Sequence, residues 1–340
     1  MNISQNIKWS ALVNSSVKQF FNSFENKDLL EYLLSNELGK IEDLLKSKDY
    51  EGARVEIDSI FTTKEKLPIE MELKLNYLKG DIEIELENYR GLEVIIKILR
   101  KNELSRKNAL ELQYKYAIKI NDERLMNECI ELFKEYEDDN SLLERKMKFY
   151  FNNGLIFKNL EFINEIEENK LESKEIFYYL SVAYLNIRDY INAKAYSEKA
   201  IQLGIGDVGV YVSILSDVNA IIERRGVIVT ISDEEKVFLK RKVELLVELI
   251  NKLPKEIELE IVTIIINILS IVDLEEAKQY FSQKQKLFAN SIQGKLLNAS
   301  IDELDNNIEQ AKQIYIDVLN YNKKEEKVYK VHKVYKVPGP

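Results

Sequence analysis

Few residues of this chain can do chemistry through an imidazole or a thiol. Its 340 residues include one histidine, His332, near the C-terminus, and one cysteine, Cys129, with Glu128 and Glu131 close by in sequence. Ser-His-Asp and Cys-His systems and multi-histidine metal sites depend on imidazoles, and acidic neighbours disfavour a reactive thiolate. We therefore expect no enzyme activity and no metal site, with Cys129 packed as a small core hydrophobe.

One glycine-rich motif has the spacing of a dinucleotide-binding loop. Gly204-Ile-Gly-Asp-Val-Gly209 fits G-x-G-x-x-G, in which glycines let the backbone approach a pyrophosphate at a helix N-terminus. A true fingerprint follows a strand, whereas this motif follows a helical pattern that ends near Leu203. We predict a helix end and a turn there. Because the chain also has no G-x-x-x-x-G-K-[ST] loop, we expect no cofactor.

Charged side chains occur in runs of the kind that helices expose to water. Acidic runs lie at 135–139 and 165–168, and without apolar burial they give no reason for acid-base or metal chemistry. Basic groups lie at Arg224-Arg225 and Lys240-Arg241-Lys242. These basic groups could hold a phosphate or an acidic peptide, and a solvated face is the alternative.

The composition indicates the elements that must position these residues. Hydrophobic residues make up 45% of the chain and charged residues 31%, and there are only four prolines, too few for the many turns of a β-sandwich or barrel. The formal charge is −9; residues 323–340 carry six Lys and two Glu, or +4, which leaves −13 for residues 1–322. An acidic body argues against general nucleic-acid binding.

The cysteine count and the length of the apolar stretches indicate the cellular compartment of the protein. A single cysteine cannot form an intrachain disulfide, and no signal-peptide pattern opens the sequence, so we expect a reducing cytoplasm. The longest apolar stretch, 259–272, is interrupted by polar residues and is shorter than a membrane span requires. It predicts a buried helix and no membrane association.

The clearest repeat unit covers residues 176–203. Its first half places aromatic, apolar and small residues on one helical face, namely Phe177, Leu180, Ser181 and Tyr184. A turn at Asp189 and Tyr190 follows, and Ala193 with Ala200 forms a small-residue stripe on a second helix. This spacing resembles the tetratricopeptide (TPR) repeat, although Ser197 stands at the usual large aromatic and Gly204 near the usual closing proline.

The second-helix signature recurs along the chain. It appears again around Ala53, Leu92, Ala277 and Ala311, and the last two are 34 residues apart, the TPR period. The resemblance covers roughly residues 41–322 and implies an all-α fold, an α-solenoid of TPR-like antiparallel helical hairpins in a right-handed superhelix. Repeats of this kind are scaffolds, so the resemblance implies a non-enzymatic protein- or peptide-binding module.

Three stretches depart from the repeat. Residues 1–40 carry a broad apolar face and are expected to form an N-terminal helical cap, with a partner surface as the alternative. An irregular insertion is expected at about 204–231, with a β-prone run at 226–231 and a new helix capped by Ser232 and Glu235. The basic C-terminal tail, 323–340, alternates like a strand; a flexible arm, an added edge strand and a foreign addition all fit it.

In TPR stacks the first helix of each hairpin lines a groove that accepts a peptide or a helix. By this resemblance the partner-binding positions of the best repeat are Glu175, Tyr178, Val182 and Asn186. Tyr178 and Val182 stand where carboxylate-clamping TPR domains place Lys and Asn, so we expect no carboxylate clamp. The apolar groove positions favour either an amphipathic helix as partner or self-packing of a closed superhelix.

Two function classes follow from the resemblance. The first is a recognition subunit of a larger bacterial assembly. The second is a peptide-responsive regulator similar to the TPR-containing quorum-sensing receptors of Gram-positive bacteria, although residues 1–40 contain no basic helix-turn-helix for DNA binding. An enzyme would require catalytic residues from a partner or a further domain. The sequence leaves the oligomeric state and the partner open.

Overall fold

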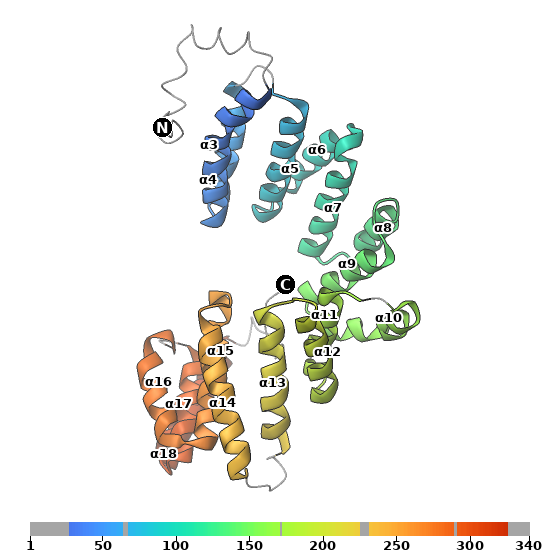
Figure 1. Ribbon diagram of the computed structural model, residues 1–340. Coiled ribbons are helices and arrows are strands. Elements are labelled where there is room, and N and C mark those ends of the chain that lie inside the picture. The colour runs from blue at the N-terminus through green and yellow to red at the C-terminus, as the bar shows by residue number, and fades with distance from the viewer. Residues whose placement is uncertain (1–26, 64–66, 171, 225–230, 289–290, 326–340) are drawn as a thin grey trace, which may run out of the picture. The chain divides into compact units, whose positions relative to one another are not determined.

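The computed structural model describes residues 27–63, 67–170, 172–224, 231–288 and 291–325. Throughout these described ranges the regular secondary structure is helical (Figure 1). Contacts divide the chain into two compact units, unit 1 (Met1–Tyr136) and unit 2 (Glu137–Pro340). The predicted all-α architecture of TPR-like helical hairpins is confirmed, whereas the handedness of the superhelix stays a prediction.

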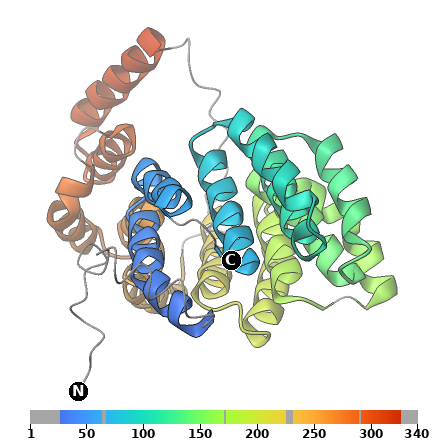
Figure 2. The ribbon, with the colours of Figure 1, turned by 90° about the horizontal axis from the view of Figure 1, so that it is seen from above.

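The described part of unit 1 forms three successive helical hairpins. Their helices are α3 (Lys27–Lys46), α4 (Tyr50–Thr63), α5 (Ile69–Glu85), α6 (Tyr89–Arg100), α7 (Arg106–Ile120) and α8 (Glu123–Phe133), with a 3-10 turn at Glu103–Ser105. The two helices of each hairpin pack against each other, as Figure 2 shows for the blue pair α3 and α4.

Unit 2 continues the pattern of paired helices. Its helices are α9 (Asp139–Asn152), α10 (Ile163–Asn169), α11 (Lys174–Asn186), α12 (Tyr190–Gln202), α13 (Asp207–Arg224), α14 (Asp233–Ile250), α15 (Glu258–Val272), α16 (Leu274–Lys284), α17 (Ile292–Leu304) and α18 (Ile308–Glu325). Shorter 3-10 segments lie at Ile156–Phe162, Lys255–Ile257 and Gln285–Phe288.

The same local device closes several hairpins. A residue in the left-handed region ends the first helix, and an Asp or Asn directly after it caps the second helix. Arg188 has φ 66°, and Asp189 Oδ1 then accepts a hydrogen bond from the Asn192 amide at 3.1 Å. Glu87 (φ 57°) and Asn88 repeat this arrangement before α6. The side-chain cap satisfies an amide that the helix leaves unpaired, so a turn of two or three residues suffices.

The small-residue stripe is buried inside the hairpins. Ala53, Ala193 and Ala277 are 0% exposed and Ala311 is 2% exposed. Each lies on the second helix of a hairpin, namely α4, α12, α16 and α18. This burial agrees with the prediction that these alanines lie where two helices meet. A small side chain at each position lets the two helices approach closely.

The expectation of an irregular insertion at about 204–231 is wrong for most of its length. Gly204 (φ 88°) and Gly206 (φ 78°) form a tight turn in which the Ile205 amide donates to the Ala200 carbonyl at 3.0 Å. Helix α13 then begins at Asp207 and runs to Arg224. It forms because its apolar residues recur at helical spacing and are buried, among them Tyr211, Val212, Ile214, Leu215 and Val218.

The predicted helix restart is confirmed. Ser232 Oγ accepts from the Glu235 amide, and the Glu235 carboxylate accepts from the Ser232 amide, each at 3.1 Å. This reciprocal capping box begins α14.

The ends of the chain fall largely outside the described residues. Residues 1–26 of the expected N-terminal cap and 326–340 of the tail lie outside them, as do residues 226–230 of the β-prone run. Helix α3 spans the expected boundary between 40 and 41, and α18 includes residues 323–325. The division into cap, solenoid and tail stays a prediction.

Candidate functional site

Two of the four predicted groove residues, which were expected to face solvent, are buried. Tyr178 and Val182 are both 0% exposed. The Tyr178 ring lies 5.9 Å, centroid to centroid, from Phe151 of α9, and burial raises the pKa of the Tyr178 hydroxyl far above its ordinary value. The expectation that Tyr178 projects from the open side of its helix is wrong.

Helix α11 is covered on every side, which explains the error. All residues from Ile176 to Ala183 are buried, and α11 packs against α9, α12, α13 and the 3-10 segment Ile156–Phe162. The side of α11 that was predicted to line a groove therefore belongs to the core of unit 2. A helix that is apolar all round gives no polar stripe from which a solvent-facing side could be read.

The two remaining groove residues keep partial exposure. Asn186 Nδ2 donates to the Val182 carbonyl at 2.9 Å, within its own helix. Glu175 Oε2 lies 3.1 Å from Ser173 Oγ. Only Glu175 and Asn186 of the four predicted residues have side chains that a partner can reach, and their role in binding stays a prediction.

Glu175 belongs to a small acidic cluster at the start of α11. Ser173 Oγ lies 3.3 Å from Glu144 Oε2 of α9 as well as 3.1 Å from Glu175 Oε2. Burial, and then the charge of Glu175, raise the pKa of the Glu144 carboxyl. The Ser173 hydroxyl has one proton and already accepts from two helix amides, so it cannot fully satisfy both carboxylates.

Several other residues singled out for chemistry have structural roles, whereas Arg225 and His332 lie outside the described residues. Cys129 is buried as predicted, and Gly204 to Gly209 form the turn and first residues of α13. Arg224 pairs with Glu235 at 3.1 Å, Lys240 with Glu276 at 3.2 Å and Lys242 with Asp217 at 2.6 Å. These three basic side chains are therefore already engaged in ion pairs.

Neither a metal cluster nor a membrane-spanning helix is found among the described residues. No group of three or more His, Cys, Asp and Glu side chains among them is placed to hold a metal ion. None of the helices described is both long enough and apolar enough to cross a bilayer.

The first-helix surface of unit 1 carries ion pairs between neighbouring hairpins. Lys115 Nζ lies 2.7 Å from Asp81 Oδ1 and 3.0 Å from the Tyr77 hydroxyl, and Lys119 lies 3.2 Å from Glu85. Both ion pairs join residues 34 apart in sequence. This register is the TPR period, and the pairs hold α7 against α5.

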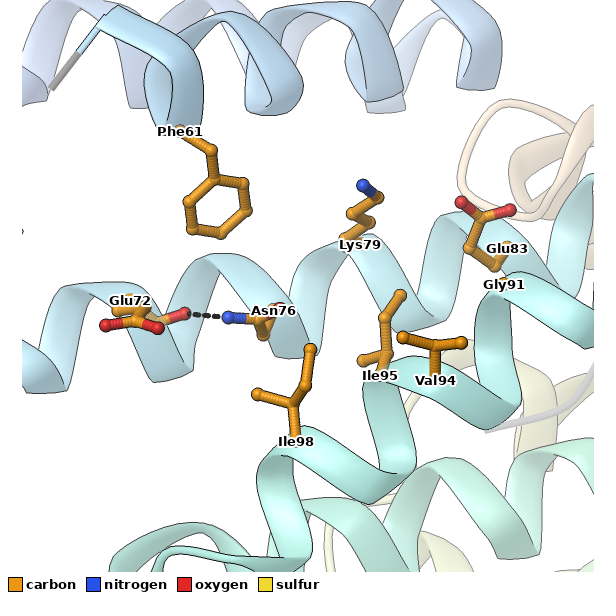
Figure 3. A pocket seen from close by; sticks show the side chains of 9 residues that line it. All are labelled: Phe61, Glu72, Asn76, Lys79, Glu83, Gly91, Val94, Ile95 and Ile98. Carbon is orange, nitrogen blue, oxygen red and sulfur yellow. Dashed lines mark hydrogen bonds between the residues drawn. The ribbon is translucent and has the colours of Figure 1, made fainter.

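A pocket opens between the hairpin α3–α4 and the hairpin α5–α6 of unit 1. It lies between α4, α5 and α6 and has a volume of about 430 Å³ (Figure 3). Its lining comprises Phe61, Glu72, Asn76, Lys79, Glu83, Gly91, Val94, Ile95 and Ile98. A space of this size falls within the range of natural ligand pockets.

One wall of the pocket is apolar. Val94 and Ile98 lie one turn apart on α6 and are 57% and 38% exposed, and Phe61 faces them from α4 (Figure 3). These side chains give the pocket the apolar lining that ligand pockets commonly have.

The α5 side of the pocket is polar. Glu72, Asn76, Lys79 and Glu83 recur at helical spacing along α5 and all line the pocket. Asn76 Nδ2 donates to the Glu72 carbonyl at 2.8 Å, and Lys79 pairs with Asp58 of α4 at 2.5 Å. The pocket therefore combines an apolar wall with charged and amide groups.

Sequence reasoning missed this pocket. It used Asn88-Tyr-Arg-Gly-Leu92 only as a repeat signature, although Gly91 has a specific role here. A Cβ at residue 91 would lie 3.0 Å from Glu83 Cδ and 2.6 Å from Asn88 Nδ2. A glycine in the first turn of a helix, where alanine is otherwise favoured, was the available signal.

Comparisons with known proteins add little to this description. No protein-family model matches the chain, and no curated protein matches it. Among solved structures it is similar to the TPR domain of P58(IPK), at 13% identity over 86% of this chain and 94% of that one. The TM-score of 0.29 is too low to extend what the helices of this chain show by themselves.

Proposed function

We propose that the chain is a non-enzymatic scaffold of the cytoplasm that binds a protein or peptide partner in the pocket between α4, α5 and α6. The observation that carries this proposal is the exposed apolar wall of Val94 and Ile98 beside a polar helix face. Such a surface suits a peptide, whose side chains and backbone need both kinds of contact.

The finer proposal is a recognition subunit of a larger bacterial assembly. The small number of imidazole and thiol groups and the helical-hairpin architecture support binding rather than catalysis. In unit 2, Glu175 and Asn186 are proposed as a second contact for the same partner class, because they are the reachable members of the predicted set.

The test is peptide selection on the intact chain. Random dodecapeptides displayed on phage are selected on the full chain, and the best sequences are synthesised and measured by fluorescence polarisation. Val94→Glu places a charge in the apolar wall and should weaken binding at least about tenfold, or about 1.4 kcal/mol.

Val55→Glu is the matched control. Val55 lies on α4, is 60% exposed and does not line the pocket, so its substitution should leave binding unchanged. Equal loss in both variants, or selection of no peptide at all, would contradict the proposed function.

A further inference from the structure

We propose that this pocket recognises a basic residue of its partner, with the charged group of a Lys or Arg side chain placed against the carboxylate of Glu83. The inference rests on the proposed function and adds to it the chemical class of the partner. Three features carry it: the burial of Glu83, the way its carboxylate is held, and the charge balance of the lining.

Glu83 is an acidic side chain that the fold buries beside the pocket. It is 3% exposed. Asn88 Nδ2 donates to Glu83 Oε2 at 2.6 Å, and the structure gives Glu83 no other hydrogen bond or ion pair among the described residues. Burying a carboxylate is costly unless it is paired with charge and hydrogen-bonded. Asn88 occupies Oε2, which leaves Oε1 as the oxygen that a cationic partner group would contact.

The carboxylate is held in place by α6. Asn88 donates to Glu83 and also caps α6, since its Oδ1 accepts from the Gly91 amide at 3.3 Å. Because a Cβ at Gly91 would lie 3.0 Å from Glu83 Cδ, the glycine provides the space that the carboxylate occupies. Glu83 therefore lies against the start of α6, next to Gly91, and lines the same pocket as Val94 (Figure 3).

The charged residues that line the pocket favour a partner with a positively charged group. Glu72, Glu83 and Lys79 line the pocket. Lys79 Nζ lies 2.5 Å from Asp58 Oδ1 on α4, so the charge of the lysine is already balanced. Glu72 and Glu83 then leave the lining acidic. An anionic or wholly apolar partner would meet these carboxylates without compensation.

The shape of the pocket favours a peptide over a free amino acid. Glu72 and Glu83 are separated by about 16 Å along α5 at ~1.5 Å per residue. That length accommodates about five residues of extended chain at ~3.3 Å each. The aliphatic stem of a Lys or Arg can lie along Val94 and Ile98 while its charged end reaches Glu83.

The experiment compares selections on the wild-type chain and on Glu83→Gln. The glutamine keeps an oxygen that can accept from Asn88, and thermal melting followed by circular dichroism checks that the variant folds. Wild-type selections of random dodecapeptides should be enriched in Lys or Arg at one position, and Glu83→Gln selections should lose that enrichment. Glu85→Gln is the matched control, since Glu85 lies on the same helix but pairs with Lys119 of α7.

A double-mutant cycle then tests the contact itself. Replacing the enriched Lys by norleucine, or the enriched Arg by citrulline, should weaken binding to the wild-type chain at least about tenfold, or about 1.4 kcal/mol. The same replacement should have little effect on Glu83→Gln.

The outcomes separate this inference from the function on which it rests. Peptides that bind the pocket, as judged by Val94→Glu, but bind Glu83→Gln as well as wild type would overturn the basic-residue inference and keep the proposed function. Selection of acidic or purely apolar peptides would do the same. Selection of no peptide would contradict both.

Discussion

Gly80 of α5 offers a sharp test of how neighbouring hairpins pack. A Cβ built at residue 80 would lie 2.3 Å from Cδ1 and 3.0 Å from Cδ2 of Leu112, on α7. Leu112 is 0% exposed, so its side chain cannot move out into solvent. Gly80→Ala must therefore displace α7 or force Leu112 from its rotamer.

Two opposing effects set the magnitude. Overpacking of this kind costs about 1–3 kcal/mol, whereas alanine gains about 0.5–1 kcal/mol over glycine inside a helix. The clash outweighs the gain in helix propensity, and we expect Gly80→Ala to lower the free energy of unfolding by about 0.5–2 kcal/mol. Urea denaturation followed by circular dichroism measures this loss.

Gly39→Ala is the control, because Gly39 lies inside α3 and a Cβ there meets no atom within 4 Å. It should stabilise the chain by about 0.5–1 kcal/mol. Leu112→Ala should also cost less in the Gly80→Ala background than in wild type, since it removes the clashing methyls. Equal stabilisation by both alanines would refute the packing of α5 on α7 described above.

Three further predictions concern unit 2. Glu144→Gln should raise the denaturation midpoint at pH 7, because burial and Glu175 raise the pKa of Glu144 and disfavour its charged form. The folded chain then binds the Glu144 proton more tightly than the unfolded chain does. The stability advantage of the variant should therefore disappear as the pH falls below the ordinary glutamate pKa of 4.5. An advantage that does not change with pH would contradict the raised pKa of Glu144. Tyr178→Ala should cost about 3–5 kcal/mol of stability as a large-to-small core change, measured by urea denaturation, and a stable variant would show that Tyr178 is not core. Ala193→Phe should cost about 1–3 kcal/mol by overpacking α12, and an unchanged melting temperature would count against the repeat alignment.

The fold could be predicted from local signals. The Asp189 turn, the Ala193 stripe and the Ser232 capping box are each written in a few adjacent residues, and the structure has all three. The predicted insertion at 204–231 is wrong because two closely spaced glycines need not break a helical repeat. In the structure Gly204 and Gly206 only shape the turn before α13.

The site could not be predicted in the same way. Phe61 and Val94 both line the pocket but are 33 positions apart in sequence. They meet there only because α4 packs against α5, and α5 against α6. Sequence periodicity assigns residues to a helix face but does not say which faces neighbouring hairpins cover. The prediction for Tyr178 was wrong for that reason. Helices α9 and α13 cover a face of α11 that the repeat pattern alone would leave open.

Peptide binding in this pocket is tested most directly by a crystal structure of the full chain with the tightest peptide from the wild-type selection. We expect the peptide to lie between α4 and α6, against Val94 and Ile98, with a Lys or Arg nitrogen about 2.8 Å from a Glu83 oxygen. A peptide bound away from this pocket would contradict both the pocket as the binding site and the role of Glu83.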